Sequence, residues 1–338
     1  MDEINKDYKE NYAVDVLTGV RPTGNLTIAN YLGAIKPLTE LQAQGLKTVI
    51  FVADMHGLTD NEPKIVKSNI KEIIADYLGL GIDPKKIFIY VQSDISTELL
   101  ELTMLLLRHI TVAELLRIPT LKDKLKQNQT PENANTLLAI YPVLMAADIL
   151  IQRSKFIPVG EDQKSHIEVT KLLARRFNSK YGNTLPVPEM QLIKPLKILG
   201  LKGLGKMSKS DPDNAIFLTD SPEIVAKKIK GAETANPGEM TPILESHFLL
   251  ARELCKSDEE FEKNKQFEID HLLGKKVMGE FKGFLEMLVV NFLSEFQDKR
   301  SEVLKQENLI EEIIQQGKNF ASKNAKDTLE QIRFSLNK

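Results

Sequence analysis

The stretch VDVLTGVRPTGNLTIAN, residues 14–30, decides the fold class. Residues 14–20 are rich in valine and run into a proline–threonine–glycine turn, as a strand followed by a loop does. The residues from 27 to 44 then carry a helical pattern. A helix that starts in such a turn presents backbone N–H groups to an anion. Thr27 and Asn30 would offer polar side chains at this exposed end, although an ordinary turn with a Thr/Asn cap explains the stretch equally well.

The alternation of strand and helix patterns continues beyond this stretch. Near-continuous apolar runs of strand length and helical patterns follow one another, with strands expected at 47–54, 86–94 and 155–160 and helices at 62–79, most of 98–151 and 162–178. Such alternation predicts right-handed βαβ units and a buried parallel sheet. Strand signals stop near residue 219. We therefore predict an α/β protein with a Rossmann-like, doubly wound parallel sheet in residues 1–218 and a C-terminal helical domain in residues 219–338.

The composition excludes several classes of protein. A net charge of −2 over 338 residues argues against a generally basic nucleic-acid binder, although it allows a local basic patch. A single cysteine, Cys255, allows neither an internal disulfide nor a thiolate metal cage, and the five histidines lack zinc-ligand spacing, so no protein metal site is expected. The chain shows no targeting segment and no apolar run of membrane-spanning length. We expect a soluble, cytoplasmic protein that does not bind membranes.

Ligands of a parallel sheet bind beyond the carboxyl ends of its strands. The segments that follow the predicted strands are therefore the candidate site: 19–33, 54–59, 92–96 and 160–166. In the last of these, Gln163 could hold a polar ligand group. His166 lies one turn into the expected helix, and we interpret it as structural.

The segment YPVLMAADIL, residues 141–150, places one carboxylate on an almost wholly apolar helix. Tyr141, Met145 and Asp148 share one stripe of this helix. Burying an unpaired carboxylate is costly. Asp148 therefore either pairs with a neighbour such as Arg153 or Lys155, or accepts a hydrogen bond from a ligand in a pocket lined by Met145 and Tyr141.

The segment GLGKMSKSDPDNA, residues 203–215, combines spaced lysines with glycines and serines. The segment has no apolar face to bury, so we expect a mobile, cationic loop outside the core. Lysines act as flexible point charges for phosphate, and Gly203 and Gly205 supply backbone freedom. A solvated charge run is the alternative, but the lysines are spaced rather than massed. Asp211 and Pro212 look like the first residues of a short helix.

Taken together, these motifs resemble the class I aminoacyl-tRNA synthetases. The resemblance rests on KMSKS (206–210), the turn followed by TIAN (27–30), YPVLMAADIL, and IPVGEDQKSHIEVT, and it is closest to the bacterial-type tryptophanyl group. It covers nearly the whole first half, whereas residues after 219 match mainly in length and type. It implies that ATP activates L-tryptophan to an adenylate with release of pyrophosphate, and that the acyl group then passes to tRNA(Trp). It also implies a homodimer, Mg²⁺ accompanying ATP, and an anticodon-binding helical domain.

The resemblance assigns roles to positions of this sequence. Lys206 and Lys209 would neutralise the leaving pyrophosphate, with Lys124 as a loosely aligned third phosphate lysine. Asp148 would accept the indole N–H. The ATP-binding positions are Arg21, Pro22, Thr23, Thr27, Ala29, Asn30, Gly160, Glu161, Asp162, Ile198, Lys206, Met207, Ser208, Lys209 and Ser210. The tryptophan-binding positions are Asp148, Met145, Tyr141, Gln163, Val159, Leu17, Gly19 and His56.

Some alternatives stay open at the level of the sequence. Ala29 replaces the glycine usual in the family's ATP signature, and we expect a modest effect on ATP affinity. An aspartate accepts a hydrogen bond from indole or phenol alike, so physics does not separate tryptophan from tyrosine. A tRNA-independent adenylyltransferase and a non-catalytic nucleotide-binding regulator are further alternatives. Two lysine groups, Lys275, Lys276 and Lys282, and Lys318, Lys323 and Lys326, could bind tRNA or be ordinary solvated helix faces.

Overall fold

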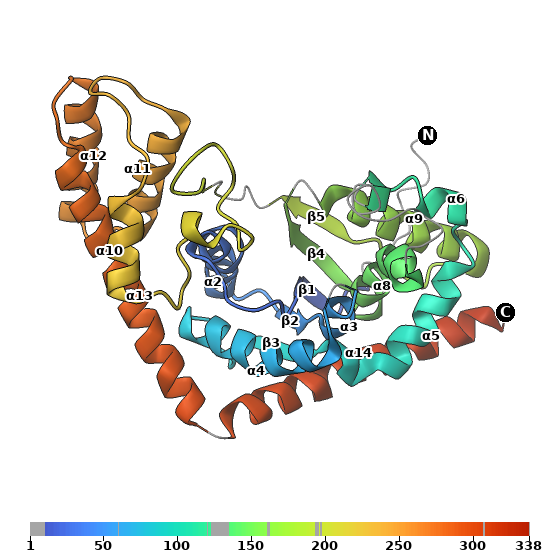
Figure 1. The fold of residues 1–338 in the computed structure, drawn as a ribbon. Helices are drawn as coiled ribbons and strands as arrows, with labels where there is room; N and C mark the ends of the chain where they lie inside the picture. Colours follow the sequence, from blue (N-terminus) through green and yellow to red (C-terminus); the bar gives the residue numbers. More distant parts are fainter. Residues whose placement is uncertain are drawn as a thin grey trace.

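A computed structural model describes residues 11–59, 61–119, 121–122, 135–160, 163–192, 196, 198–306 and 308–337. Its centre is a five-stranded sheet in the order β3-β2-β1-β4-β5, in which every neighbouring pair is parallel (Figure 1). The strands are β1 Val14–Val20, β2 Thr48–Val52, β3 Ile87–Val91, β4 Ser154–Val159 and β5 Glu189–Leu192. The predicted parallel sheet is confirmed. The sequence analysis missed β5.

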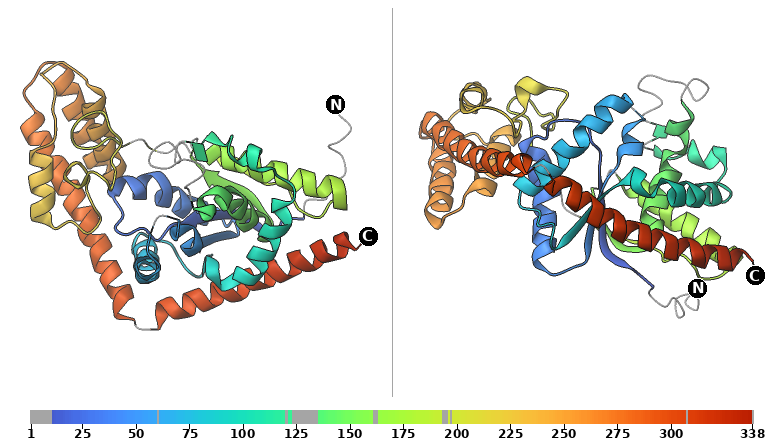
Figure 2. Two further views of the ribbon diagram at one scale, coloured as in Figure 1. Left: turned by 45° about the vertical axis from the view of Figure 1, so that its right-hand side comes forward. Right: turned by 90° about the horizontal axis from the view of Figure 1, so that it is seen from below.

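Helices cover both faces of the sheet. On one face lie the helical segment 28–43 and α4, and on the other lie α5, α8 and α9, while α14 has buried residues in both layers (Figures 1 and 2). Successive residues of a strand alternate between these layers, as Val16 and Leu17 do in β1. The bounds are α1 Ile28–Asn30, a π-helical turn Tyr31–Ile35, α2 Lys36–Ala43, α3 Asp54–Gly57, α4 Pro63–Gly79, a 3-10 turn Gln92–Ile95, α5 Ser96–Leu107, α6 Val112–Leu115, α8 Thr136–Ile151 and α9 Lys164–Tyr181.

The C-terminal part forms a helical lobe and then returns to the sheet. Helices α10 to α12 stand beside the sheet, α13 leads away from them, and α14 runs beneath the sheet (Figures 1 and 2). The bounds are a 3-10 turn Pro212–Asn214, α10 Pro222–Lys230, α11 Pro242–Leu254, α12 Asp258–Leu272, α13 Met278–Lys305 and α14 Leu309–Leu336. None of the helices in the described ranges is long and apolar enough to cross a bilayer.

Helix α14 covers the free edge of the sheet at β3. A Cβ atom on Gly317 would lie 1.8 Å from the carbonyl oxygen of Ile89, so the helix backbone touches the strand directly. Beside this contact, Phe320 stacks on Phe88 with ring centroids 4.1 Å apart. An edge strand covered by a helix cannot pair with another chain. Residues of α10, α11 and α13 share one apolar core with the helices on this side of the sheet, while α14 packs directly against β3. The boundary at residue 219 stays a prediction.

Candidate functional site

The candidate site lies at the carboxyl edge of the sheet, around the neighbours β1 and β4. The chain leaves β1 toward β2 and leaves β4 toward β5, so the strand order reverses between β1 and β4. Ligands of doubly wound sheets bind in the crevice at such a switch point. The four predicted segments follow β1, β2, β3 and β4 at this edge. Lys124, Glu161 and Asp162 lie outside the described residues.

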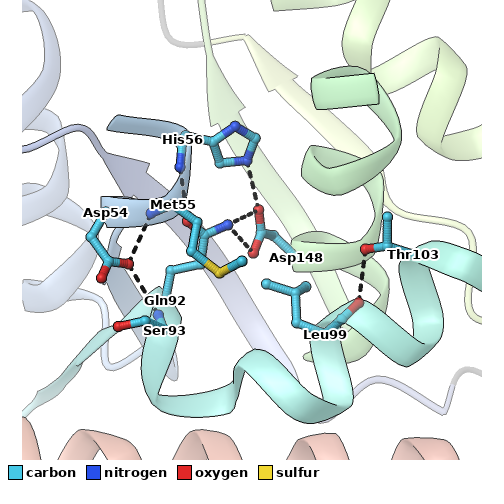
Figure 3. Close-up of polar contacts among 8 residues, drawn as sticks. All are labelled: Asp54, Met55, His56, Gln92, Ser93, Leu99, Thr103 and Asp148. Atoms are coloured by element: carbon cyan, nitrogen blue, oxygen red, sulfur yellow. Dashed lines mark hydrogen bonds and ion pairs between the residues drawn. The ribbon is translucent and has the colours of Figure 1, made fainter. Parts of the chain in front are cut away.

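Asp148 is fully buried on α8 and is held by residues from two other elements (Figure 3). Nε2 of His56 lies 2.9 Å from its Oδ2, and Nε2 of Gln92 donates to Oδ1 and Oδ2 at 2.8 Å each. When Asp148 is ionised it only accepts hydrogen bonds, and the proton of this contact then lies on Nε2 of His56. The described partners are thus not the sequence neighbours Arg153 and Lys155. Sequence reasoning missed Gln92, although it is the first residue of the predicted segment 92–96.

The pKa of Asp148 is raised from its ordinary value, and burial is the largest of several opposing effects. Burial raises the pKa of its carboxyl group, while the hydrogen bonds and charge of His56 and the hydrogen bond of Gln92 lower it. Asp54 adds a further raising effect. Asp54 itself accepts hydrogen bonds from the backbone N–H groups of Met55 and Ser93, both at 3.0 Å, which ties the end of β2 to the end of β3 (Figure 3).

Tyr141 and His166 form a second polar contact beside this cluster. The hydroxyl of Tyr141 lies 3.1 Å from Nε2 of His166, and both side chains are buried. The ring of His56 lies edge-on to Tyr141, with centroids 6.5 Å apart. The structure therefore brings Tyr141, His56 and Asp148 together, as the predicted pocket requires. The contact with Tyr141 agrees with a structural role for His166.

Of the other predicted pocket positions, Leu17 lies in the middle of β1, while Gly19, Val159 and Gln163 lie near the carboxyl ends of strands. Leu17 is buried in the core, whereas Val159 is half-buried at the end of β4. Gly19 faces the ring of Phe51, and a Cβ atom on Gly19 would lie 2.5 Å from that ring. Only a glycine fits there without displacing Phe51. The backbone N–H of Gln163 donates to the carbonyl of Gly160 at 3.0 Å, just before α9 begins.

The turn after β1 leads into a capped helix. Gly24 adopts a φ of 86°, which favours glycine. The backbone N–H of Thr27 donates to Oδ1 of Asn30 at 2.9 Å, and the backbone N–H of Asn30 donates to Oγ1 of Thr27 at 3.3 Å. Thr27 is fully buried, so the expectation of two exposed polar side chains is wrong for Thr27. Ala29 is also buried, in the core beneath this turn.

The lysine-containing segment 203–215 is partly anchored in the core. The backbone N–H of Met207 donates to the carbonyl of Ile198 at 3.1 Å, and Gly200 donates to Gly205 at 2.9 Å, which closes a narrow hairpin. Met207 is 3% exposed and Ala215 is fully buried. The expectation that the segment has no apolar residues to bury is therefore wrong. Ile198 is buried in the same core.

Lys209 reaches the turn that follows β1. Its Nζ donates to the carbonyl oxygen of Gly24 at 2.9 Å. Burial lowers the pKa of Lys209, and the negative charge of Asp76 opposes that effect. Lys206 is exposed to solvent, and the hydroxyls of Ser208 and Ser210 lie 2.8 Å apart. One lysine of the segment thus contacts the predicted nucleotide turn while the other faces solvent.

The same segment is bonded to the helical lobe. The backbone N–H of Leu199 donates to Oγ of Ser246 on α11 at 2.8 Å. Gly203 donates to the carboxylate of Glu233 at 2.8 Å, and the N–H of Glu233 donates to the carbonyl of Leu201 at 2.8 Å. The position of the lysines is therefore coupled to the position of the lobe.

Most of the lysines considered for tRNA binding make contacts within the protein. Nζ of Lys282 donates to the carbonyl of Ala232 at 2.7 Å, and burial lowers its pKa. Three of the others pair with carboxylates: Lys275 with Asp270 at 2.6 Å, Lys318 with Asp94 at 3.4 Å and Lys323 with Asp327 at 2.6 Å. These contacts favour the alternative of ordinary helix faces for these four lysines.

Known proteins share both the sequence and the fold of this chain. The family of class I tRNA synthetases (W and Y) matches residues 9–322. The chain is 36% identical over 334 residues to the tryptophan–tRNA ligase of Porphyromonas gingivalis, covering 95% of this chain and 98% of that protein. It is 34% identical over 332 residues to the tryptophan–tRNA ligase of Bacillus subtilis, covering 95% and 97%. The crystal structure of tryptophanyl-tRNA synthetase from Campylobacter jejuni, complexed with ADP and tryptophan, superposes with a TM-score of 0.82 at 30% identity, covering 96% of this chain and 100% of that one.

Proposed function

The chain belongs to the class I tRNA synthetases of the W and Y family, and we propose that the site described above ligates L-tryptophan to tRNA(Trp). Curated relatives over nearly the full length are tryptophan–tRNA ligases. One structural observation supports the site assignment most directly. A buried carboxylate acceptor, Asp148, and a lysine that contacts the nucleotide turn, Lys209, lie at the same edge of one parallel sheet.

The first step joins the amino acid to the nucleotide. A carboxylate oxygen of tryptophan attacks the α-phosphorus of ATP, and the bond to the bridging oxygen breaks so that pyrophosphate leaves with the electron pair. Lys206 and Lys209 neutralise the charge that develops on that leaving group. No enzyme nucleophile is required, because the substrate supplies its own. Catalysis is then positioning plus electrostatic stabilisation.

The second step uses the mixed anhydride formed in the first. A ribose hydroxyl at the 3′ end of tRNA(Trp) attacks the acyl carbon, and AMP leaves. Leu199, Gly203 and Leu201 are hydrogen-bonded to the helical lobe. Binding of tRNA to the lobe can therefore affect the position of the lysine segment. We assign anticodon binding to the α10–α13 region within residues 219–338, and nucleotide and amino-acid binding to residues 1–218.

Magnesium enters as the complex with ATP in this proposal. No group of three or more His, Cys, Asp or Glu side chains that could hold a metal ion occurs among the described residues. Mg²⁺ in nucleotide sites is commonly held through substrate phosphate oxygens and water. The ATP-binding positions are those assigned by the family signature, from Arg21 to Asn30 and from Lys206 to Ser210, together with Gly160, Glu161, Asp162 and Ile198. Lys124 is proposed as a third phosphate ligand.

Tryptophan is recognised in the pocket around Asp148. The carboxylate accepts the indole N–H, and Met145, Tyr141 and Val159 supply the pocket wall with Leu17 and Gly19. Gln163 and His56 complete the polar contacts. We also propose that the protein forms a homodimer and acts in the cytoplasm, where tRNA is charged.

Amino-acid-dependent exchange of pyrophosphate into ATP tests this function. The protein should support exchange with tryptophan and not with tyrosine or pantoate, and it should then charge tRNA(Trp). Exchange with tyrosine instead would identify a tyrosyl enzyme, and exchange with pantoate would identify a small-molecule adenylyltransferase. Nucleotide binding without exchange would indicate a regulator.

A further inference from the structure

We propose that Gln92 is a positioning residue that determines specificity: its side-chain amide holds Asp148 as an ionised, oriented acceptor for the ring N–H of the substrate. The inference rests on the proposed role of Asp148 in tryptophan recognition. Gln92 is the first residue after β3 and was absent from the predicted site residues. It acts on the substrate only through Asp148.

The geometry fixes the orientation of the Gln92 amide. Its Nε2 is 2.8 Å from both carboxylate oxygens of Asp148, and its Oε1 accepts a hydrogen bond from the backbone N–H of His56 at 3.3 Å. A flipped amide would turn an oxygen toward a carboxylate and an NH₂ group toward an N–H donor. Both side chains are fully buried, so water cannot replace these contacts (Figure 3).

The hydrogen bonds from Gln92 and His56 leave Asp148 few lone-pair sites for a donor group of the substrate. An ionised carboxylate offers about four lone-pair sites. Two contacts from Gln92 and one from His56 leave about one site for a substrate donor. A ring N–H satisfies that site, whereas a ring without a donor leaves a buried acceptor unpaired. Preference for tryptophan over an isostere that lacks the N–H therefore depends on Asp148 remaining ionised and fixed.

The charges around Asp148 make this arrangement sensitive to pH. His56 and Gln92 favour the ionised form, while burial and Asp54 favour the protonated form. Tyr90, fully buried on β3, has its pKa raised by burial and by the charge of Asp148. The net effect is a raised pKa for Asp148, chiefly through burial, and removing the amide of Gln92 removes one of the effects that oppose this rise. A protonated Asp148 would present a donor to the indole N–H, which weakens tryptophan binding.

A purely structural role for Gln92 predicts something else. Gln92 joins β3 to α3 and α8, so its loss could loosen the site as a whole. In that case every substrate would be affected alike, and the pH dependence would keep its shape. Thr103 provides a matched control: it is buried on the neighbouring helix α5, and its Oγ1 donates to the carbonyl of Leu99 at 2.8 Å (Figure 3).

The experiment compares tryptophan with 3-(benzothiophen-3-yl)-L-alanine, in which sulfur replaces the ring N–H. The kcat/KM of pyrophosphate exchange is measured for both between pH 5 and 9, in the wild type, Gln92→Met and Thr103→Val. In Gln92→Met, kcat/KM for tryptophan should fall about 10-fold or more, while that for the analogue changes little. The acid limb of the tryptophan profile should move to higher pH. Thr103→Val should keep the wild-type preference and profile.

Two further variants keep the inference falsifiable. Gln92→Asn shortens the side chain by one methylene group and so moves the amide away from Asp148. This variant should lose the same preference, and it provides the test if Gln92→Met fails to fold. Asp148→Ala separates the two hypotheses. If Asp148→Ala keeps the wild-type preference for tryptophan over the analogue, the proposed role of Asp148 is wrong and the inference falls with it. If Asp148→Ala abolishes the preference while both Gln92 variants retain it, or lose activity equally on both substrates, the inference alone is overturned.

Discussion

Lys209 links two parts of the site that lie far apart in the chain. Its ammonium group bonds the carbonyl of Gly24, 185 residues away, while Met207 anchors the same segment in the core. Lys209 is partly buried, so its ammonium group is partly removed from water, and this burial lowers its pKa. A cation in such a position interacts more strongly with phosphate than one in bulk solvent.

Replacing Lys209 should therefore impair chemistry more than binding. In Lys209→Met, kcat for tryptophan-dependent pyrophosphate exchange should fall by roughly 10²–10³-fold, while KM for tryptophan changes little. Lys202→Met is the control, because the described hydrogen bonds of Lys202 come from its backbone, with Asn214. Steady-state exchange kinetics measure both. Equal losses of kcat in the two variants would contradict the proposed catalytic role of Lys209.

His247 should make stability sensitive to acid. It is buried on α11, and burial, with a smaller contribution from Lys282, lowers its pKa to about 4. An unfolded histidine titrates near 6.5, so between pH 6.5 and 4 the unfolded state binds more protons. The free energy of unfolding should therefore fall by about 3 kcal/mol as the pH drops through that window.

Urea unfolding at a series of pH values measures this effect. In His247→Gln the loss of stability between pH 6.5 and 4 should be clearly smaller than in the wild type. His109, whose pKa is also lowered by burial, leaves a remaining slope in both proteins. An unchanged slope in His247→Gln would show that the buried histidine is not the cause.

At the scale of elements, the strands that could be predicted carry their signal in their own residues. Strands β1, β2, β3 and β4 are apolar runs rich in β-branched residues, and each was expected within a few residues of its bounds. Strand β5, with the sequence EMQL, is only four residues long and half of them are polar, and its pairing with β4 makes it a strand. Local pattern could not reveal it.

The site residues likewise divide into those with a local sequence signal and those without one. Asp148 was found because a carboxylate on an apolar helix conflicts with its surroundings, and Lys209 because of a spaced lysine motif. Gln92 has no such local signature, since a single glutamine after a strand is unremarkable in sequence. Its role follows from a contact with Asp148, 56 residues away, that exists only in the folded chain. The buried side of the lysine segment was likewise invisible, because its partners lie in other elements.

The contact between α14 and β3 gives an element-scale prediction. Gly317→Ala should destabilise the protein, because the new Cβ would lie 1.8 Å from the carbonyl oxygen of Ile89 and force the helix off the strand. In Gly283→Ala, on α13, the new Cβ meets nothing within 4 Å among the described residues, and the change should be neutral or stabilise by up to about 1 kcal/mol. Thermal unfolding of both variants tests this, and similar shifts in the two would contradict the close approach.

At the scale of the whole molecule, α13 connects the helical lobe to α4, on one face of the sheet, through an ion pair in which Asp76 is buried and Arg300 is half-buried. Nε of Arg300 donates to Oδ1 of Asp76 on α4 at 2.6 Å, and Arg300 also pairs with Glu72. Gly79 packs against Phe296 along the same interface. The charge of Asp76 also acts on Lys209. The charge of Asp76 thus acts both at the interface between α13 and α4 and on the lysine-containing segment.

Removing one partner of this ion pair should lower the free energy of unfolding more than removing both partners. Arg300→Met leaves Asp76 buried without its main partner, and we expect a loss of about 3 kcal/mol in the free energy of unfolding. The double variant Arg300→Met with Asp76→Asn should recover part of that loss. Urea unfolding of the wild type, both single variants and the double variant measures the coupling. Strictly additive effects would show that the two residues stabilise the protein independently.

The central claim is that one edge of the parallel sheet holds both substrates of the ligation. A crystal structure of the protein with tryptophan and a non-hydrolysable ATP analogue tests it most directly. We predict the indole nitrogen within hydrogen-bonding distance of Asp148, and the ammonium groups of Lys206 and Lys209 at the terminal phosphates. An indole turned away from Asp148, or a triphosphate bound with both lysines out of reach, would contradict the account.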